Sequence, residues 1–320
     1  MKPKEILVFG ASGQIGRHLI RKLTKNNYKV VAVTRNIHQK GYTLKTQANP
    51  GYLEIVELCY FNIEKIKSLI KECSICINLI GILFEKRKNY FKNIHSDFPN
   101  LLAKLSAETN IEKFIHVSSL GIENSKDSKY ATSKLDGENK IKNNFKSSVV
   151  LKPSLVYSVD DNFTTNLMTL LNRLPIMPIY YEGKTKFAPI HVTDLVQIIF
   201  DVVQGKTNEQ TIECIGPEIL SFKEIILKLL KAIDKKRLLI PLPIIIAKLM
   251  ARVFEIMPNP LITVDQLNLL KHDNISSGKY KTNFDLNIKA NKIFEEEILK
   301  YSFNWRSGGQ FSRNNISKIS

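Results

Sequence analysis

The chain has 320 residues, 43% of them hydrophobic, which is enough for one large α/β domain with or without a smaller cap. Its 47 lysine and arginine residues exceed its 30 aspartate and glutamate residues, and the net charge of +17 suggests an anionic partner. The lysines are scattered and form no basic stripe with interleaved aromatic residues, so nucleic acid is excluded as the main ligand, while an anionic membrane surface is kept as a partner.

The chain opens with the pattern of a strand, a glycine-rich turn and a helix. An apolar, β-branched run at 5–9 leads into Gly10-Ala-Ser12-Gly13-Gln14-Ile15-Gly16, and apolar residues then recur at helical spacing to residue 24. Glycine lets the main chain touch a pyrophosphate, and the positive end of the helix dipole receives the anion. Three glycines in this context predict a dinucleotide-binding βαβ unit, with cofactor contacts from residues 10 and 12–16.

Strands and helices alternate through the first half of the chain. Apolar runs predict the strands, and apolar residues at helical spacing predict the helices between them. The predicted strands are 5–9, 29–33, 52–57, 75–79, 113–117 and 148–151, and the predicted helices are 14–24, 63–71, 90–109 and 130–143. This alternation predicts an α/β fold, a Rossmann-type doubly wound parallel sheet with helices on both faces.

The residue after the second strand distinguishes the two nicotinamide cofactors. NAD-binding folds place a carboxylate there for the ribose 2′-hydroxyl, whereas NADP-binding folds place a cation near the 2′-phosphate. In this chain the strand ends at Thr34-Arg35, without Asp or Glu. A guanidinium pairs with a phosphate, so the sequence favours NADP(H) over NAD(H). Arg17 is a second candidate for the same pocket, and a solvated surface position is its equal alternative.

The fourth strand ends in Asn78, and Gly81 follows it closely. Ligands bind at the carboxyl ends of parallel strands, so both are candidate cofactor contacts, although Asn78 also suits a buried cap. Just before this strand, Cys73 and Cys76 have the spacing of a redox or zinc motif, but no second ligand pair accompanies them. We expect buried structural thiols in a reducing compartment, and no metal.

A candidate catalytic set of four residues follows the fifth strand. Ser118 and Ser119 end that strand, and Tyr130 and Lys134 follow at i and i+4 of a predicted helix. Positions i and i+4 share a helix face, so the phenol and the ammonium are expected in one pocket. A free tyrosine ionises only near pH ~10, and a nearby ammonium favours the phenolate that acid–base catalysis needs. A hydroxyl at the strand end is suited to hold a substrate carbonyl, and Lys134 to bond the nicotinamide ribose.

Together, Gly10-x-x-Gly13-x-x-Gly16, Ser118-Ser119 and Tyr130-x-x-x-Lys134 resemble the short-chain dehydrogenase/reductase superfamily in its extended or atypical branch. Lys152-Pro153-Ser154 and the later Pro189-Ile-His-Val-Thr-Asp194 are similar to segments that shape the substrate side in that branch, and Pro153 is added to the candidate cofactor contacts. The resemblance covers most of residues 5–215. It implies an NAD(P)-dependent oxidoreductase or epimerase.

A narrower resemblance concerns three segments. The runs 76–81 and 112–118, and above all Ala251–Pro258 followed by Leu261–Asp265, resemble the NADPH-binding accessory subunits of respiratory complex I and their bacterial relatives. That resemblance implies a protein that holds NADPH for assembly or stability, with cofactor roles for the three glycines and Arg35. The chain departs from the pattern at 59–62, where an acidic or amide residue is expected beside the adenine, at Lys152, where Arg is usual, and at Ser158, where Gly is common.

After Pro153 the pattern loosens. A strand–helix pair at 186–190 and 192–203 is expected to return to the main sheet, whereas 211–215 and 221–233 are expected in a small, mostly helical cap. The expected domains are 1–205, with a substrate-side insertion around 154–185, and the cap, 206–305. The polar tail 306–320 is expected to be disordered.

The most apolar stretch, 238–257, is expected to hold an amphipathic helix at 243–257. Pro241 and Pro243 keep one helix from crossing the whole stretch, and no apolar run reaches the ~18 residues of a membrane span. Lys248, Arg252 and Glu255 lie on one narrow face, and the remaining face is apolar. Two alternatives stay open: an interfacial helix that meets a membrane or a partner, or a buried helix that covers the substrate cleft.

The sequence therefore predicts an NADPH-holding accessory or assembly protein of the NADH:quinone oxidoreductase. The alternatives are a working oxidoreductase or epimerase on a small carbonyl or hydroxyl substrate, and a module that reads the NADP(H) ratio. Because the first strand begins near residue 5, we expect no signal peptide and a cytoplasmic protein, or one peripheral on the cytosolic face of the inner membrane. The sequence identifies neither a substrate nor an oligomeric state.

Overall fold

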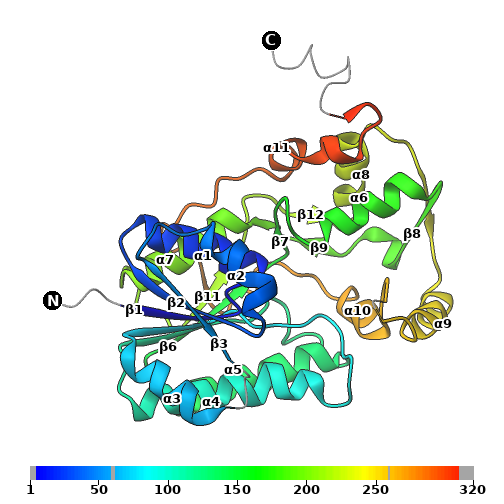
Figure 1. The fold of residues 1–320 in the computed structure, drawn as a ribbon. Helices are drawn as coiled ribbons and strands as arrows, with labels where there is room; N and C mark the ends of the chain where they lie inside the picture. The colour runs from blue at the N-terminus through cyan, green and yellow to red at the C-terminus, as the bar shows by residue number, and fades with distance from the viewer. Residues whose placement is uncertain (1–4, 59–61, 259, 310–320) are drawn as a thin grey trace. The chain divides into compact units, whose positions relative to one another are not determined.

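A computed structural model describes residues 5–58, 62–258 and 260–309 (Figure 1). Cys59, Tyr60 and Phe61, beside the expected adenine site, and residues 310–320 of the expected tail lie outside the described residues. Contacts within the chain define two compact units. The first comprises Met1–Pro153, Val192–Cys214 and Ser276–Lys289, and the second comprises Ser154–His191, Ile215–Ile275 and Ala290–Ser320. The chain thus passes between the units several times, and not once at residue 205.

The first unit contains a parallel sheet of eight strands in the order β14-β11-β6-β5-β4-β1-β2-β3. The strands are β1 (Glu5–Phe9), β2 (Lys29–Thr34), β3 (Leu53–Glu57), β4 (Ile75–Asn78), β5 (Lys113–Val117), β6 (Ser148–Pro153), β11 (Thr211–Cys214) and β14 (Lys281–Thr282). The central strands are buried without alternation, as expected for a sheet covered on both faces. The predicted Rossmann-type sheet is confirmed.

Helices cover both faces of this sheet (Figure 1). On one face lie α3 (Ile63–Glu72), α4 (Phe98–Glu108) and α5 (Lys129–Asn144), and on the other lie α1 (Gln14–Lys25), α2 (Ile37–Lys45) and α7 (Val192–Val203). The register places Phe9 beside Asn78, and Asn78 beside His116, so β1, β4 and β5 end side by side. This common edge carries the candidate site.

The predicted helix 90–109 is interrupted by a π-turn, η1 (Lys92–Asp97), which precedes α4. Pro99 has no N–H, so the carbonyl of His95 lacks the donor that a continuous helix would supply. The N–H of Phe98 donates instead to the carbonyl of Asn93, five residues back. Such turns are frequent at functional sites.

Two expectations about the second half were wrong. β9 (Lys186–Phe187) and β10 (Ile190–His191) pair with short strands of the second unit, and only α7 packs in the first unit. Conversely, 211–214 was expected in the cap, yet β11 pairs with β6 in the main sheet. Without β11, the N–H and C=O groups along one side of β6 would lie unpaired at the edge of the sheet.

The second unit is a mixed assembly of short strands and helices. Its strands are β7 (Val156–Tyr157), β8 (Ile176–Ile179), β9, β10, β12 (Leu220–Ser221) and β13 (Leu238–Pro241). Its helices are α6 (Thr164–Arg173), η2 (Tyr181–Gly183), α8 (Phe222–Ala232), α9 (Ile244–Phe254), α10 (Val264–Leu269), α11 (Phe294–Leu299) and η3 (Ser302–Trp305). The core packs α6, α8 and α11 around Met168, Ile226 and Phe294.

α9 lies within the predicted amphipathic helix 243–257. Only Ala247 and Ala251 of this helix are buried, whereas Ile245, Leu249 and Val253 are exposed by 81%, 63% and 59%. α9 is therefore not a core helix of the second unit. Across the described residues, each helix is too short or too polar to pass through a bilayer.

Candidate functional site

The turn between β1 and α1 is too tight for side chains at Gly10 and Gly16. Gly10 has a φ of +78°, and a Cβ there would lie 3.0 Å from the carbonyl carbon of Leu79. A Cβ on Gly16 would lie 2.4 Å from the carbonyl oxygen of Ala11. Gly13 is the N-cap of α1 and offers no side-chain cap, and the first turn of the helix has no acidic residue. The turn thus presents bare main chain and the positive end of a helix, the arrangement that suits an anion.

The two arginines expected near the adenosine phosphate have different surroundings. Arg35 is exposed directly after β2, where the sequence placed it. Arg17 is half-buried, and its Nη1 donates to the carbonyl oxygen of Ser12 at 2.8 Å, so it braces the glycine turn from within. Of the two, only Arg35 has its side chain on the open surface.

Asn78 ends β4 fully buried and uses both ends of its amide within the protein. Its Oδ1 accepts from the N–H of Ile80 at 3.1 Å, and its Nδ2 lies 3.1 Å from Nδ1 of His116. These bonds give Asn78 the capping role that the sequence left open. They hold the start of the segment that carries Gly81, which is exposed.

α5 places Tyr130 and Lys134 together, as predicted. The Nζ of Lys134 lies 5.2 Å from the ring centroid of Tyr130 and donates to the carbonyl oxygen of Ser118 at 3.1 Å. Lys134 is only 6% exposed, and no carboxylate pairs with it in the described part of the chain. The hydroxyl of Ser118 is also buried and lacks a partner among the described residues, while Ser119 is half-buried. The bond from Lys134 to Ser118 thus joins α5 to the end of β5. The Lys134 ammonium and the Ser118 hydroxyl there can still bind polar groups of a ligand.

Two buried histidines flank this pair, and sequence reasoning missed both. Burial, and then the charge of Lys134, lower the pKa of His95 to about 2 and the pKa of His116 to about 3. Both imidazoles are therefore neutral at physiological pH, and Nε2 of His116 has no partner among the described residues. The sequence feature that could have pointed to His95 is Pro99, which has no N–H to donate to the carbonyl of His95. The signal for His116 was its place two residues before Ser118 in a predicted strand.

These residues fit a dinucleotide. The glycine turn presents bare main chain at the start of α1, and the missing Cβ at Gly16 lets the helix pack directly on the main chain of Gly10 and Ala11. The buried ammonium of Lys134 has no carboxylate partner in the described part of the chain. An ideal Cβ on Gly81 would lie 3.9 Å from Nζ of Lys134, so the segment after β4 reaches the same place. A pyrophosphate in the cradle and ribose hydroxyls at Lys134 would satisfy both groups.

A second buried cation lies behind this edge. Lys152 of β6 is fully buried and pairs with Glu138 at 3.1 Å and with Glu123. The Nζ also lies 5.6 Å from the ring centroid of Tyr280. Burial lowers the pKa of Lys152, but the two carboxylates outweigh it and raise the pKa overall. The network ties α5 to the sheet.

The cysteine pair is buried, as expected. Burial raises the pKa of Cys73 to about 12 and that of Cys76 well above its usual range. Both thiols therefore stay protonated and are poor metal ligands. The described residues contain no cluster of three or more His, Cys, Asp or Glu side chains suited to a metal ion.

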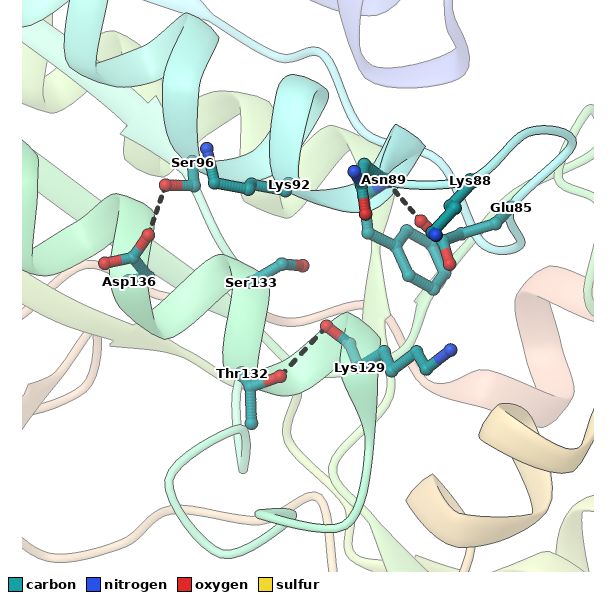
Figure 2. Close-up of a pocket in the computed structure, with 10 residues that line it drawn as sticks. Glu85, Lys88, Asn89, Lys92, Ser96, Lys129, Thr132, Ser133 and Asp136 are labelled. Carbon is teal, nitrogen blue, oxygen red and sulfur yellow. Dashed lines mark hydrogen bonds between the residues drawn. The ribbon is translucent and has the colours of Figure 1, made fainter.

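A surface pocket of about 350 Å³ lies between the segment after β4 and the outer side of α5 (Figure 2). Lys88, Lys92 and Lys129 line it together with Glu85 and Asp136. Its lining contains no candidate site residue, so the pocket is separate from the edge described above. Two of its lining residues contact groups at that edge: the Ser133 hydroxyl lies 3.0 Å from Nδ1 of His95, and Phe91 packs against Tyr130.

The fold and this edge define a Rossmann protein of the extended short-chain dehydrogenase/reductase type. Residues 6–214 match the NAD dependent epimerase/dehydratase family, and the chain belongs to it. Solved structures agree on the fold. A UDP-glucuronic acid 4-epimerase from Bacillus cereus, with UDP-glucuronic acid and NAD, has a TM-score of 0.71 and 19% identity over 94% of this chain and 99% of its own.

Curated relatives point to one particular group. The mitochondrial NADH-ubiquinone oxidoreductase 40 kDa subunit of Neurospora crassa is 25% identical over 89% of this chain and 76% of its own. The mitochondrial NADH dehydrogenase (ubiquinone) 1 alpha subcomplex subunit 9 of Arabidopsis thaliana is 26% identical over 94% of this chain and 78% of its own. A ceramide reductase of Caulobacter vibrioides is 26% identical over 59% of this chain and 57% of its own.

Proposed function

We propose that this chain is an accessory or assembly-type subunit of an NADH:quinone oxidoreductase and that it holds NADPH. The observation that carries the proposal is the similarity to two such subunits, which covers most of this chain and most of each subunit. The narrower resemblance at 251–265 points the same way. The cradle at Gly10–Gly16 and the buried Lys134 supply a place for the dinucleotide.

The preference for NADPH rests on Arg35. It is exposed at the end of β2, and a guanidinium there suits the adenosine 2′-phosphate. In this proposal Ser12, Gln14 and Ile15 contribute main-chain contacts to the pyrophosphate, and Asn78, Gly81 and Pro153 shape the nicotinamide side.

Membrane attachment is a further part of the proposal. α9 presents Ile245, Leu249 and Val253 to solvent, while Lys248 and Arg252 supply positive charge beside them. Apolar area next to cations is the composition of a helix that lies in the interface of an anionic bilayer. The protein would then sit peripherally on the cytosolic face of the inner membrane, against the oxidoreductase.

The proposal is tested by affinity purification of the tagged chain from its own cells in mild detergent. We expect oxidoreductase subunits in the eluate and NADPH released by denaturation, identified by mass spectrometry. Recovery of the chain without any subunit of that enzyme, in cells that contain the enzyme, would contradict the accessory role. Release of NADH alone would contradict the cofactor preference.

A working oxidoreductase or epimerase is the second candidate. It is favoured by the intact Tyr130 and Lys134, whose phenol and ammonium share one face of α5, and by the similarity to a ceramide reductase. In this case the phenolic oxygen of Tyr130 would exchange a proton with a substrate hydroxyl or carbonyl, and the nicotinamide would supply or accept the hydride.

Tyr130→Phe separates the two candidates, because it removes the proton and keeps the ring. An accessory role predicts normal assembly of the oxidoreductase in cells that carry this variant. A catalytic role predicts a phenotype as severe as deletion of the gene, although the variant protein is folded and abundant.

A further inference from the structure

His95 lies at the centre of the π-turn η1 and is 1% exposed. Its carbonyl oxygen faces Gly137 of α5, where a Cβ would lie only 2.0 Å away. The absence of a side chain at Gly137 therefore lets α5 rest directly on the turn. The His95 side chain is held between the segment after β4 and the helix that carries Tyr130 and Lys134.

Two hydrogen bonds fix the form of the imidazole. The main-chain N–H of Ile82 donates to Nε2 at 3.1 Å, so Nε2 carries no proton. In the neutral ring the proton is then on Nδ1, which lies 3.0 Å from the hydroxyl oxygen of Ser133 and donates to it. The Ser133 hydroxyl in turn donates to the carbonyl oxygen of Tyr130 at 2.8 Å. A continuous path of hydrogen bonds joins Ile82 to the main chain at Tyr130.

Ring packing adds a second connection. The imidazole contacts the Tyr130 ring edge to face, with centroids 5.2 Å apart, and stacks on Phe91 at 5.3 Å. Phe91 also meets Tyr130 edge to face at 5.8 Å. The three rings form one cluster, in which His95 and Phe91 both pack against the Tyr130 ring.

We propose that His95 is a positioning residue that holds the segment Ile80–Ile82 and the Tyr130–Lys134 pair in one geometry for the dinucleotide. The inference rests on the dinucleotide site of the proposed function and is independent of the oxidoreductase and membrane parts. Its charge state suits this task, because a protonated Nε2 would lose the bond from Ile82. A neutral ring also adds no repulsion to the nearby ammonium of Lys134.

The test compares His95→Gln, His95→Leu and His95→Ala in the full chain. A glutamine oxygen can reach the position of Nε2 and accept from Ile82, whereas leucine keeps volume without an acceptor. We expect the Leu and Ala variants to bind NADPH about tenfold or more weakly, because the N–H of Ile82 loses its acceptor and the segment after β4 loses its anchor. Gln should recover most of that loss. Kd is measured by calorimetry well below each melting temperature, so that lost stability alone does not register.

Ser133→Ala and Thr132→Ala form a matched pair on the same turn of α5. Only Ser133 bonds His95, whereas the Thr132 hydroxyl bonds carbonyl groups of its own helix. We expect weaker NADPH binding for Ser133→Ala and unchanged binding for Thr132→Ala. Nitrogen-15 NMR of labelled histidine checks the ring directly and should show one neutral imidazole with its proton on Nδ1 that does not titrate down to mildly acidic pH.

Equal NADPH affinity for wild type and the folded Leu and Ala variants would overturn the inference and leave the dinucleotide site standing. A protonated Nε2 on His95 in the NMR spectrum would do the same. Failure of the wild-type chain to bind any dinucleotide is a different result, because it would remove the cofactor part of the proposed function itself.

Discussion

The Nζ of Lys134 lies 3.1 Å from the carbonyl oxygen of Ser118, and this bond connects α5 to the end of β5. The ammonium is buried there without a carboxylate partner in the described part of the chain. A buried cation is costly unless other groups satisfy it. The Lys134 ammonium is therefore suited to bind hydroxyl groups of a ligand.

Lys134→Met tests whether the Lys134 ammonium binds the dinucleotide. Methionine fills similar space without charge, so we expect NADPH affinity to fall about tenfold or more while the melting temperature is maintained or rises. Lys129→Met is the matched control, since Lys129 lies on the same helix but is exposed in the outer pocket. A Lys134→Met protein that binds NADPH as tightly as wild type would remove Lys134 from the site.

Gly13→Ala tests the cradle without disturbing the fold. A Cβ on Gly13 would meet only the Gly10 carbonyl oxygen, at 3.2 Å, and Gly13 is exposed. We expect a small change in melting temperature and a loss of about tenfold in NADPH affinity, because the methyl group occupies the approach to the helix end. Gly41→Ala, in α2, is the control and should leave binding unchanged. Unaltered affinity in Gly13→Ala would show that the anion does not bind there.

Lys152→Met tests the buried network. It leaves the carboxylates of Glu138 and Glu123 without their cation, so we expect a loss of about 3–5 kcal/mol in unfolding free energy, measured by denaturant titration. Lys281→Met breaks an exposed pair with Glu209, and because exposed ion pairs contribute little to stability, its unfolding free energy should stay close to that of wild type. Equal losses in the two variants would contradict the role given to Lys152.

The same network predicts a pH dependence. The pKa of Lys152 is raised above its ordinary 10.5, so its contribution to stability is complete below that pH and is lost as pH rises through the folded-state pKa. We expect the stability difference between wild type and Lys152→Met to be constant near neutral pH and to shrink in strongly alkaline buffer. A difference that grows with alkaline pH would have the wrong sign for this account.

The fold shows what a single sequence can reveal. The turn Gly10–Gly16 and the spacing of Tyr130 and Lys134 are local patterns, and the structure places both at the expected sheet edge. β11 and β14 have four and two residues, too few for a pattern, and their place depends on pairing with distant strands.

The residues that support the site could not be predicted from the sequence for a similar reason. Lys152, Glu123 and Glu138 come from a strand, a loop and a helix, and their charges meet only after folding. His95 lay within an ordinary helical pattern, and the π-turn that sets its position follows from Pro99.

The apolar face of α9 predicts binding to anionic vesicles. Leu249→Glu with Val253→Glu should abolish cosedimentation with vesicles that contain an anionic phospholipid, since both side chains are exposed and apolar. Ile219→Glu with Leu227→Glu changes charge equally at exposed positions outside α9 and should bind like wild type. If both double variants cosediment like the parent chain, α9 is not the membrane contact.

The proposed function requires above all that a nicotinamide dinucleotide binds in the cradle beside Lys134, with its adenosine phosphate near Arg35. Calorimetric titration of the wild-type chain and of Arg35→Leu, with NADPH and with NADH, measures this directly. We predict tight NADPH binding by wild type, and a loss of about tenfold or more for NADPH with little change for NADH in Arg35→Leu. A wild-type chain that binds neither dinucleotide would show that this edge of the sheet is not a nicotinamide-binding site.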